Sequence, residues 1–235
     1  MTQPKKVNYL NNKDILKQIH QSKMTYCYLQ DDRYSEPDII VESVKKINKT
    51  AIKQAQINKA AKLSTLAYQQ AVAKGDWTKK PKQKEFTVDP KTMAIDELVF
   101  RVMTYDHIPD EPGRKKTTKT VADTKAKVNF PPFKHYILDS NGINPREVVR
   151  SHWVGGLHNG HFSVDHGRIT NELGKMFMKL VERYSQRGNW RGYTYVDEMR
   201  GQALVQLAQI GLQFNEAKSD NPFAYYTATV NNSFT

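Results

Sequence analysis

The sequence predicts an all-α helical domain over residues 151–235, preceded by a basic, partly disordered N-terminal extension. Apolar residues recur at helical intervals for about four turns after Arg168, which indicates an amphipathic helix. A second apolar stripe follows Thr194. Asn221-Pro222 is typical of a third helix start, with Asn as the cap and Pro in the first helical position. Three helices joined by short turns make a compact module.

The chain is strongly basic. Its 235 residues include 36 Lys and Arg against 24 Asp and Glu, which gives a formal net charge of +12. This balance is typical of proteins that contact phosphate backbones, although a basic surface that only aids solubility has the same signature. Hydrophobic residues make up 38% of the chain. Because soluble proteins usually have about 45–50%, we expect part of the chain to be mobile.

Cys27 is the only cysteine, which excludes an intrachain disulfide and a zinc site built from cysteines. No apolar run approaches the roughly 20 residues needed to cross a bilayer. The first residues also lack the apolar stretch of a secretion signal. We therefore expect a cytoplasmic protein with no membrane partner.

Residues 1–74 form the first predicted region, which is basic and helical. Asn11 is a suitable cap for a short helix that has Asp14 in its first turn. From Ile39 to Lys74 the chain is rich in Ala, Gln and Lys, with apolar residues at mostly helical intervals. This pattern predicts either one long basic helix or two.

Residues 75–150 form the second predicted region, a Pro- and Lys-rich linker with a short helix around Ile95–Met103. The stretch from Gly75 to Pro90 shows little apolar periodicity, so we expect disorder there, or order only on binding. The region holds two basic runs, which are either phosphate-binding arms or mobile solvated segments. They are Lys79, Lys80, Lys82 and Lys84, and Arg114, Lys115, Lys116 and Lys119.

The third predicted region, 151–235, holds the three helices. Gly188 is expected to end the first one, and Thr194 is expected to cap the second with Asp197 in a variant of the capping box. The second helix has a long polar face that is mostly uncharged. The members of this face are Glu198, Gln202, Gln206, Gln209 and Gln213.

This acidic, Gln-bearing helix ends at Phe214 and is followed by the turn Asn221-Pro-Phe-Ala-Tyr-Tyr. The stretch from Arg191-Gly-Tyr-Thr-Tyr to Val230 resembles the second conserved region of bacterial sigma factors. It is still more similar to the late-transcription sigma factors of T-even-type bacteriophages, in a cyanophage-like variant. The segment from Asn8 to Leu16 also resembles the start of the phage protein, whereas residues 20–150 have no counterpart there.

The resemblance implies a polymerase-binding helix. In this family the helix docks on the coiled-coil clamp helices of the polymerase β′ subunit. Carboxylates and amides suit such a contact, because they can meet a basic partner helix without forming an apolar patch. The alternative is a solvated helix face. The matching residues are Asp197, Glu198, Gln202, Gln206 and Gln209.

The resemblance also implies a promoter-reading surface, where Tyr226 aligns with the tyrosine that stacks on an unpaired base of the −10 element. Stacking is worth about 1–3 kcal/mol per base, comparable to the cost of unstacking. By helical spacing alone, Phe223 belongs to the core, and Tyr225 and Tyr226 cannot both face inward. The DNA-binding set is Lys218, Phe223, Tyr225, Tyr226, Asn231 and Asn232.

The chain departs from the family in two ways. Thr229 and Val230 replace the paired tryptophans of housekeeping sigma factors, which predicts weaker strand separation or dependence on other phage proteins. The sequence also stops at Thr235, within the expected third helix and before the tail by which the phage family contacts the sliding clamp. We expect either a fragment or a protein whose missing functions are supplied elsewhere, with a late co-activator and the sliding clamp as further partners.

A histidine-rich segment suggests a different function. Imidazoles beside the carboxylate of Asp165 can bind zinc or a nuclease-type divalent ion. The spacing matches no helical metal-binding motif, and nearby glycines favour polar histidines in a loop. The histidines are His152, His158, His161 and His166.

The sequence thus predicts a non-enzymatic late sigma factor that binds host core RNA polymerase and promoter DNA in the cytoplasm of an infected bacterium. No catalytic residue, metal or cofactor is expected, because the chemistry of RNA synthesis belongs to the polymerase. The alternatives are a metal-dependent nuclease and a general nucleic-acid-binding protein.

Overall fold

The structure is a computed structural model that describes residues 10–75, 78–109, 124 and 126–235. The chain divides into two compact units, and each is described by itself. The helical unit draws on residues 1–28, 105–132 and 151–235. The sheet unit draws on residues 29–104 and 133–150.

The sheet unit is built around a five-stranded sheet with the strand order β1-β5-β4-β3-β2. Strand β2 runs parallel to β3, whereas β4 is antiparallel to both β3 and β5. The described residues therefore form a mixed α/β structure, and the predicted all-α fold class is wrong. The strands are β1 (Cys27–Leu29), β2 (Ile39–Val41), β3 (Phe100–Met103), β4 (Phe133–Leu138) and β5 (Pro145–Ser151).

Helix α2 (Lys49–Lys74) packs on this sheet. Asn48 caps it, because the Asn48 side-chain oxygen accepts a hydrogen bond from the Ala51 N–H at 3.0 Å. Ala51 and Ala55 are buried in one apolar cluster with Leu98, Phe100 and Leu138. The predicted helical stretch 39–74 therefore contains one strand, β2, and one long helix.

Among its described residues, the region 75–150 contains β3, β4 and most of β5, where the sequence predicts a linker with a short helix. The expected helix at Ile95–Met103 is a 3-10 turn at Ile95–Glu97 followed by β3. Chain segments that the sequence assigns to loops are thus central strands of a sheet.

The stretch from Gly75 to Pro90, for which the sequence predicts disorder or order on binding, packs partly against α2. The Phe86 ring meets the Tyr68 ring edge-on at 6.1 Å, and the Val88 N–H donates to Ser64 Oγ at 2.9 Å. The second basic run, at positions 114–119, lies outside the described residues.

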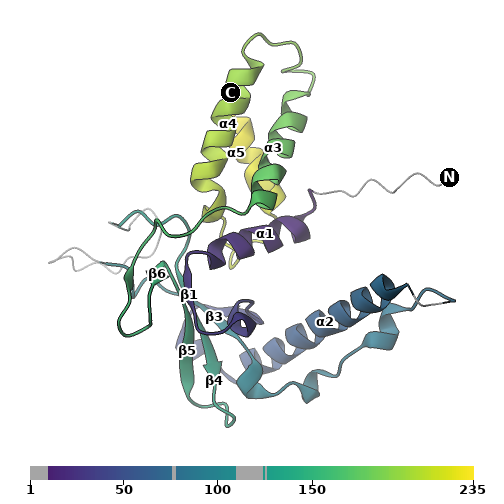
Figure 1. Ribbon diagram of the computed structural model, residues 1–235, viewed down its shortest axis with the longest axis vertical. Helices are drawn as coiled ribbons and strands as arrows, with labels where there is room; N and C mark the ends of the chain where they lie inside the picture. Colours follow the sequence, from purple (N-terminus) through teal and green to yellow (C-terminus); the bar gives the residue numbers. More distant parts are fainter. Residues whose placement is uncertain (1–9, 76–77, 110–123, 125) are drawn as a thin grey trace. The chain divides into compact units, whose positions relative to one another are not determined.

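The described part of the helical unit contains four α-helices and a small hairpin. Helices α3, α4 and α5 pack side by side (Figure 1), and α1 contacts α3 and α5. The buried core includes Leu173, Phe177, Leu180, Val181, Leu207, Tyr226, Val230 and Phe234. The elements are α1 (Asn12–Met24), α3 (Asn171–Ser185), α4 (Val196–Ile210), α5 (Pro222–Phe234), β6 (Trp153–Val154) and β7 (His161–Phe162).

Two of the predicted helix caps in this unit are confirmed. Asn11 accepts a hydrogen bond from the Asp14 N–H at the start of α1, and Asn221 accepts one from the Ala224 N–H at the start of α5. The predicted Thr194 cap is wrong, because α4 begins after Tyr195 and has no side-chain cap hydrogen bond.

Candidate functional site

One side of α4 faces solvent along the length of the helix. We call it the docking stripe and define it as Glu198, Gln202, Val205 and Gln209, which recur at helical spacing and are all exposed. Val205 is 51% exposed, whereas Ala203 and Leu207 on the inner side of α4 are fully buried. Three of the predicted polymerase-binding residues therefore share one accessible face.

The side chains of the other two predicted polymerase-binding residues make contacts within the helical unit. The Asp197 carboxylate is exposed but pairs with the Arg200 guanidinium at 3.0 Å, and Arg200 Nε donates to Ser185 Oγ at 2.7 Å. Gln206 is half-buried, and its side-chain oxygen accepts a hydrogen bond from Ser233 Oγ of α5. Arg200, which Asp197 pairs with, thus joins α4 to α3, and Gln206 joins α4 to α5.

Tyr226 is buried and does not present its ring to a ligand. It is 1% exposed, its ring packs edge-on against Phe177 at 4.9 Å, and its hydroxyl donates to the Gly211 carbonyl oxygen. Burial raises the pKa of the Tyr226 hydroxyl above its ordinary value. In this arrangement Tyr226 is a core residue, whereas the resemblance implies a ring that stacks on a base.

The remaining residues of the predicted DNA-binding set are more accessible. Tyr225 is half-buried against Phe214, with ring centroids 5.5 Å apart, and burial raises the pKa of the Tyr225 hydroxyl. Phe223 is 38% exposed, although its spacing favours the core. Lys218, Asn231 and Asn232 are exposed.

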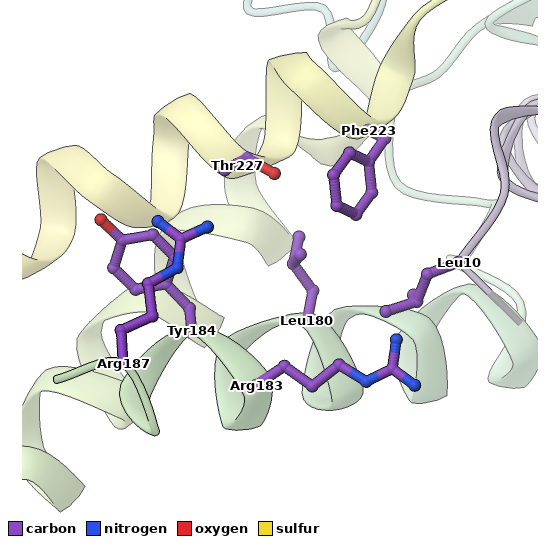
Figure 2. Close-up of a pocket in the computed structure, with 7 residues that line it drawn as sticks. All are labelled: Leu10, Leu180, Arg183, Tyr184, Arg187, Phe223 and Thr227. Carbon is purple, nitrogen blue, oxygen red and sulfur yellow. The ribbon is translucent and has the colours of Figure 1, made fainter. Parts of the chain in front are cut away.

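A small cleft of about 90 Å³ lies between α3 and α5. Figure 2 shows the ring of Phe223 above Leu180, with Leu10 to the right, Arg183 below and Arg187 beside Tyr184. Its lining residues are Leu10, Leu180, Arg183, Tyr184, Arg187, Phe223 and Thr227. We refer to it as the α3–α5 cleft.

The cleft combines three kinds of chemistry. Phe223 offers an aromatic ring, and Arg183 and Arg187, four residues apart in the sequence, are exposed cations. The Arg187 guanidinium lies over the Tyr184 ring at 4.2 Å. Thr227 Oγ1 is buried and has no hydrogen-bond partner within the described part of the chain. An aromatic ring, two guanidinium groups and an unused hydroxyl suit an unpaired nucleotide, which has a flat base, a phosphate and polar base edges.

The start of the chain closes one end of this cleft. Leu10 lines it, and Asn12 Oδ1 accepts a hydrogen bond from the Phe223 N–H at 2.9 Å. Asn12 therefore satisfies one of the free N–H groups at the start of α5 and fixes the N-terminal segment beside Phe223. Two segments at opposite ends of the sequence meet here.

The histidine-rich segment brings no three His, Cys, Asp or Glu side chains together as candidate metal ligands within the described residues. His152 is fully buried, with Nε2 2.9 Å from Asn129 Oδ1 and Nδ1 3.1 Å from Ser151 Oγ. Burial lowers the pKa of His152 to about 3, with the nearby His107, His166 and Lys23 adding to the shift.

Sequence reasoning missed the arginines and the threonine of the α3–α5 cleft. Arg183 lies in the last turn of α3, and Arg187 follows two residues after the end of this helix. Two arginines at the end of a predicted amphipathic helix are a readable signal. Nothing in the sequence marks Thr227, because its lack of a partner depends on how α3 and α5 pack.

Comparisons with protein-family models, with curated proteins and with solved structures find no match to the chain. Within the described ranges, no helix combines the length and the apolarity that a membrane crossing requires.

Proposed function

We propose that this protein is a late-transcription sigma factor of the phage type, which binds host core RNA polymerase and captures an unpaired base of a −10-like promoter element. The observation that carries the proposal is the meeting of two segments that independently resemble this family. Leu10 and Asn12 from the first segment lie against Phe223 of the second, at the α3–α5 cleft. If both resemblances were accidental, there would be no reason for the two segments to lie together at one site.

The docking stripe supports the polymerase contact. The whole chain carries a net charge of +12, yet the stripe contains one carboxylate, Glu198, and no basic residue. An acidic and amide-rich face on a basic protein favours a basic partner surface over phosphate. Val205 adds an exposed apolar contact at the centre of the stripe.

The α3–α5 cleft supports the contact with an unpaired base. In this proposal Phe223 stacks on the base, while Arg183 and Arg187 neutralise the neighbouring phosphates. Thr227 Oγ1 supplies a hydrogen bond to a base edge, since a threonine hydroxyl can donate or accept. Tyr226 supports α5 from the core and has no direct contact with DNA.

Retention on immobilised core RNA polymerase tests the docking role. We expect the double variant Glu198→Ala/Gln202→Ala to lose about tenfold in affinity, because central interface residues often cost more than 1 kcal/mol when truncated. The matched control is Glu182→Ala/Gln186→Ala, which removes the same residue types at the same sequence spacing from exposed positions at the end of α3 and in its C-cap. This control should bind as wild type does.

Two results would overturn the proposal. If core polymerase does not retain the wild-type protein, the protein is not a sigma factor, and the general nucleic-acid-binding alternative takes its place. If Glu198→Ala/Gln202→Ala binds as tightly as wild type, α4 is not the docking helix. A nuclease would instead show chelator-sensitive cleavage of DNA that is lost in His161→Ala.

A further inference from the structure

A row of aromatic rings runs from the core of the helical unit to its surface. The Tyr184 ring meets Phe234 at 5.2 Å, and Phe234 meets Trp190 at 5.6 Å. Trp190 meets Tyr193 at 6.5 Å, and Tyr193 meets Tyr195 at 6.3 Å. Each pair has the edge-to-face geometry that aromatic rings favour. The row therefore connects two buried rings to the loop between α3 and α4.

The outer end of this row is open to solvent. Tyr193 is 53% exposed and Tyr195 is 61% exposed, whereas Tyr184 and Phe234 are 5% and 3% exposed. Two neighbouring tyrosines with more than half of their surface in water contribute little to the core. Both rings are therefore accessible to a ligand.

The loop backbone holds these rings in place. The Trp190 N–H donates to the Arg187 carbonyl oxygen at 3.0 Å, and the Tyr193 N–H donates to the Trp190 carbonyl oxygen at 3.1 Å. Gly192 has a φ of 81°, a left-handed conformation that glycine adopts without strain. The tyrosines thus lie on successive turns with a fixed backbone, so little ordering is needed before they bind a ligand.

The charge of the loop selects the class of ligand. The segment 186–195 contains two arginines and no acidic residue. Arg187 and Arg191 are both exposed, and Arg187 also lines the α3–α5 cleft. Exposed tyrosines between arginines suit single-stranded nucleic acid, because every base has a face that can stack and every nucleotide has a phosphate.

We infer that Tyr193 and Tyr195 form a second stacking platform for single-stranded nucleic acid, with Arg187 and Arg191 binding its phosphates. The platform lies beyond the α3–α5 cleft along α3, and Arg187 belongs to both. A strand that leaves the cleft can therefore continue to the tyrosines. A protein partner is less well matched, because the sequence neighbours of the rings include Arg191 and Thr194, which are polar, where an interface core is apolar.

Fluorescence anisotropy with a labelled oligo(dT) of about 16 nucleotides, in the absence of polymerase, tests this inference. We expect Tyr193→Ala/Tyr195→Ala in the full chain to weaken binding about tenfold or more, because two stacking rings are lost. Tyr193→Phe/Tyr195→Phe keeps both rings and should stay within about threefold of wild type. Arg191→Gln should weaken binding and reduce its dependence on salt.

Two controls separate stacking from loss of structure. Met178→Ala removes another apolar side chain that is 61% exposed, on α3 of the same unit, and should bind oligo(dT) as wild type does. The thermal unfolding midpoint of Tyr193→Ala/Tyr195→Ala should match that of wild type, because both rings are mostly in solvent. If that midpoint falls, the double variant Tyr193→Leu/Tyr195→Leu is used in place of the alanine double variant. It keeps the apolar bulk but has no ring to stack on a base, and it should also weaken oligo(dT) binding about tenfold.

Three outcomes would overturn the inference. Oligo(dT) binding that is unchanged in the alanine double variant shows that the rings do not stack on bases. Equal loss in the alanine and phenylalanine double variants shows that the hydroxyls matter and the rings do not. Unchanged oligo(dT) binding together with lost retention on polymerase shows that the loop contacts protein. Failure of the docking role would appear only in the polymerase experiment, so the two proposals fail separately.

Discussion

The Nζ of Lys23 donates hydrogen bonds to the Glu216 carboxylate and to the Phe214 carbonyl oxygen, each at 2.7 Å, inside the helical unit. Lys23 is fully buried, and the Glu216 side chain is 14% exposed. Lys23 belongs to α1, while Phe214 and Glu216 lie in the connection between α4 and α5. This ion pair therefore joins the start of the chain to the part that holds the candidate site.

Lys23→Met is expected to lower the free energy of unfolding by about 3 kcal/mol, because it leaves Glu216 as a buried charge without its cation. Urea unfolding measures the change. The control is Lys175→Met, whose ion pair with Glu172 is exposed at the surface and should contribute less than about 1 kcal/mol. Equal effects of the two substitutions would show that the buried pair does not hold α1 in place.

Substitution of Tyr226 is expected to affect mainly stability, whereas substitution of Phe223 is expected to affect mainly oligo(dT) binding. Tyr226→Ala should lower the free energy of unfolding by about 3–5 kcal/mol, because it empties a fully buried ring site next to Phe177. Tyr226→Phe should cost about 1 kcal/mol, since only the hydrogen bond to the Gly211 carbonyl oxygen is lost.

Phe223→Ala should change stability much less, while weakening oligo(dT) binding about fivefold or more through the loss of a stacking ring. Urea unfolding and fluorescence anisotropy give both quantities for each variant. If Tyr226→Phe weakened oligo(dT) binding more than Phe223→Ala did, Tyr226 would reach the ligand after all, and the assignment of the two residues would have to be exchanged.

The helices of the candidate site could be predicted because their signals are local. Asn11 and Asn221 cap helices through the N–H groups of residues three positions later, and the apolar stripe of α3 has one period throughout. The exposed positions of Glu198, Gln202 and Gln209 follow from the helical periodicity of the apolar residues of α4. No comparable local signal decides between Tyr225 and Tyr226, because the burial of Tyr226 depends on Phe177, almost fifty residues earlier.

The strands could not be predicted because buried charged residues interrupt their apolar pattern. Arg101 in β3 is 1% exposed; its guanidinium stacks on Phe133 at 3.8 Å, and its Nε donates to His135 Nε2 at 2.9 Å. Lys134 in β4 is buried 3.7 Å from the Glu147 carboxylate of β5. Such side chains are buried only when a distant partner is present, and the sequence alone does not show the partner.

His152 is expected to make stability depend on pH. The pKa of His152 is about 3 in the folded chain against an ordinary value of 6.5, so the unfolded chain binds the proton first as pH falls. Stability is therefore complete above pH 6.5 and decreases below it, with a slope that approaches about 1.4 kcal/mol per pH unit. His152 has a φ of 55°, which asparagine tolerates, so His152→Asn removes the titration without a backbone conflict.

Urea unfolding at about pH 7 and at about pH 5 measures this dependence. Both values lie above the ordinary pKa values of carboxylates, at about 4, so these groups contribute little to the slope. His152→Asn should flatten the slope relative to wild type. His166, whose pKa burial also lowers, is present in both proteins. A wild-type slope in His152→Asn would show that His152 is not protonated on unfolding.

Thr227→Val is expected to make the protein more stable and a weaker binder. The Thr227 hydroxyl is buried without a hydrogen-bond partner in the described structure, and a valine of the same shape removes that cost, which is about 1 kcal/mol. The same substitution removes the hydroxyl that we assign to a base edge in the α3–α5 cleft. Urea unfolding should show the gain and oligo(dT) anisotropy a loss of about threefold or more. Thr227→Ser keeps the hydroxyl and should retain binding. A Thr227→Val protein that gains stability and binds as wild type does would show that the hydroxyl faces no ligand.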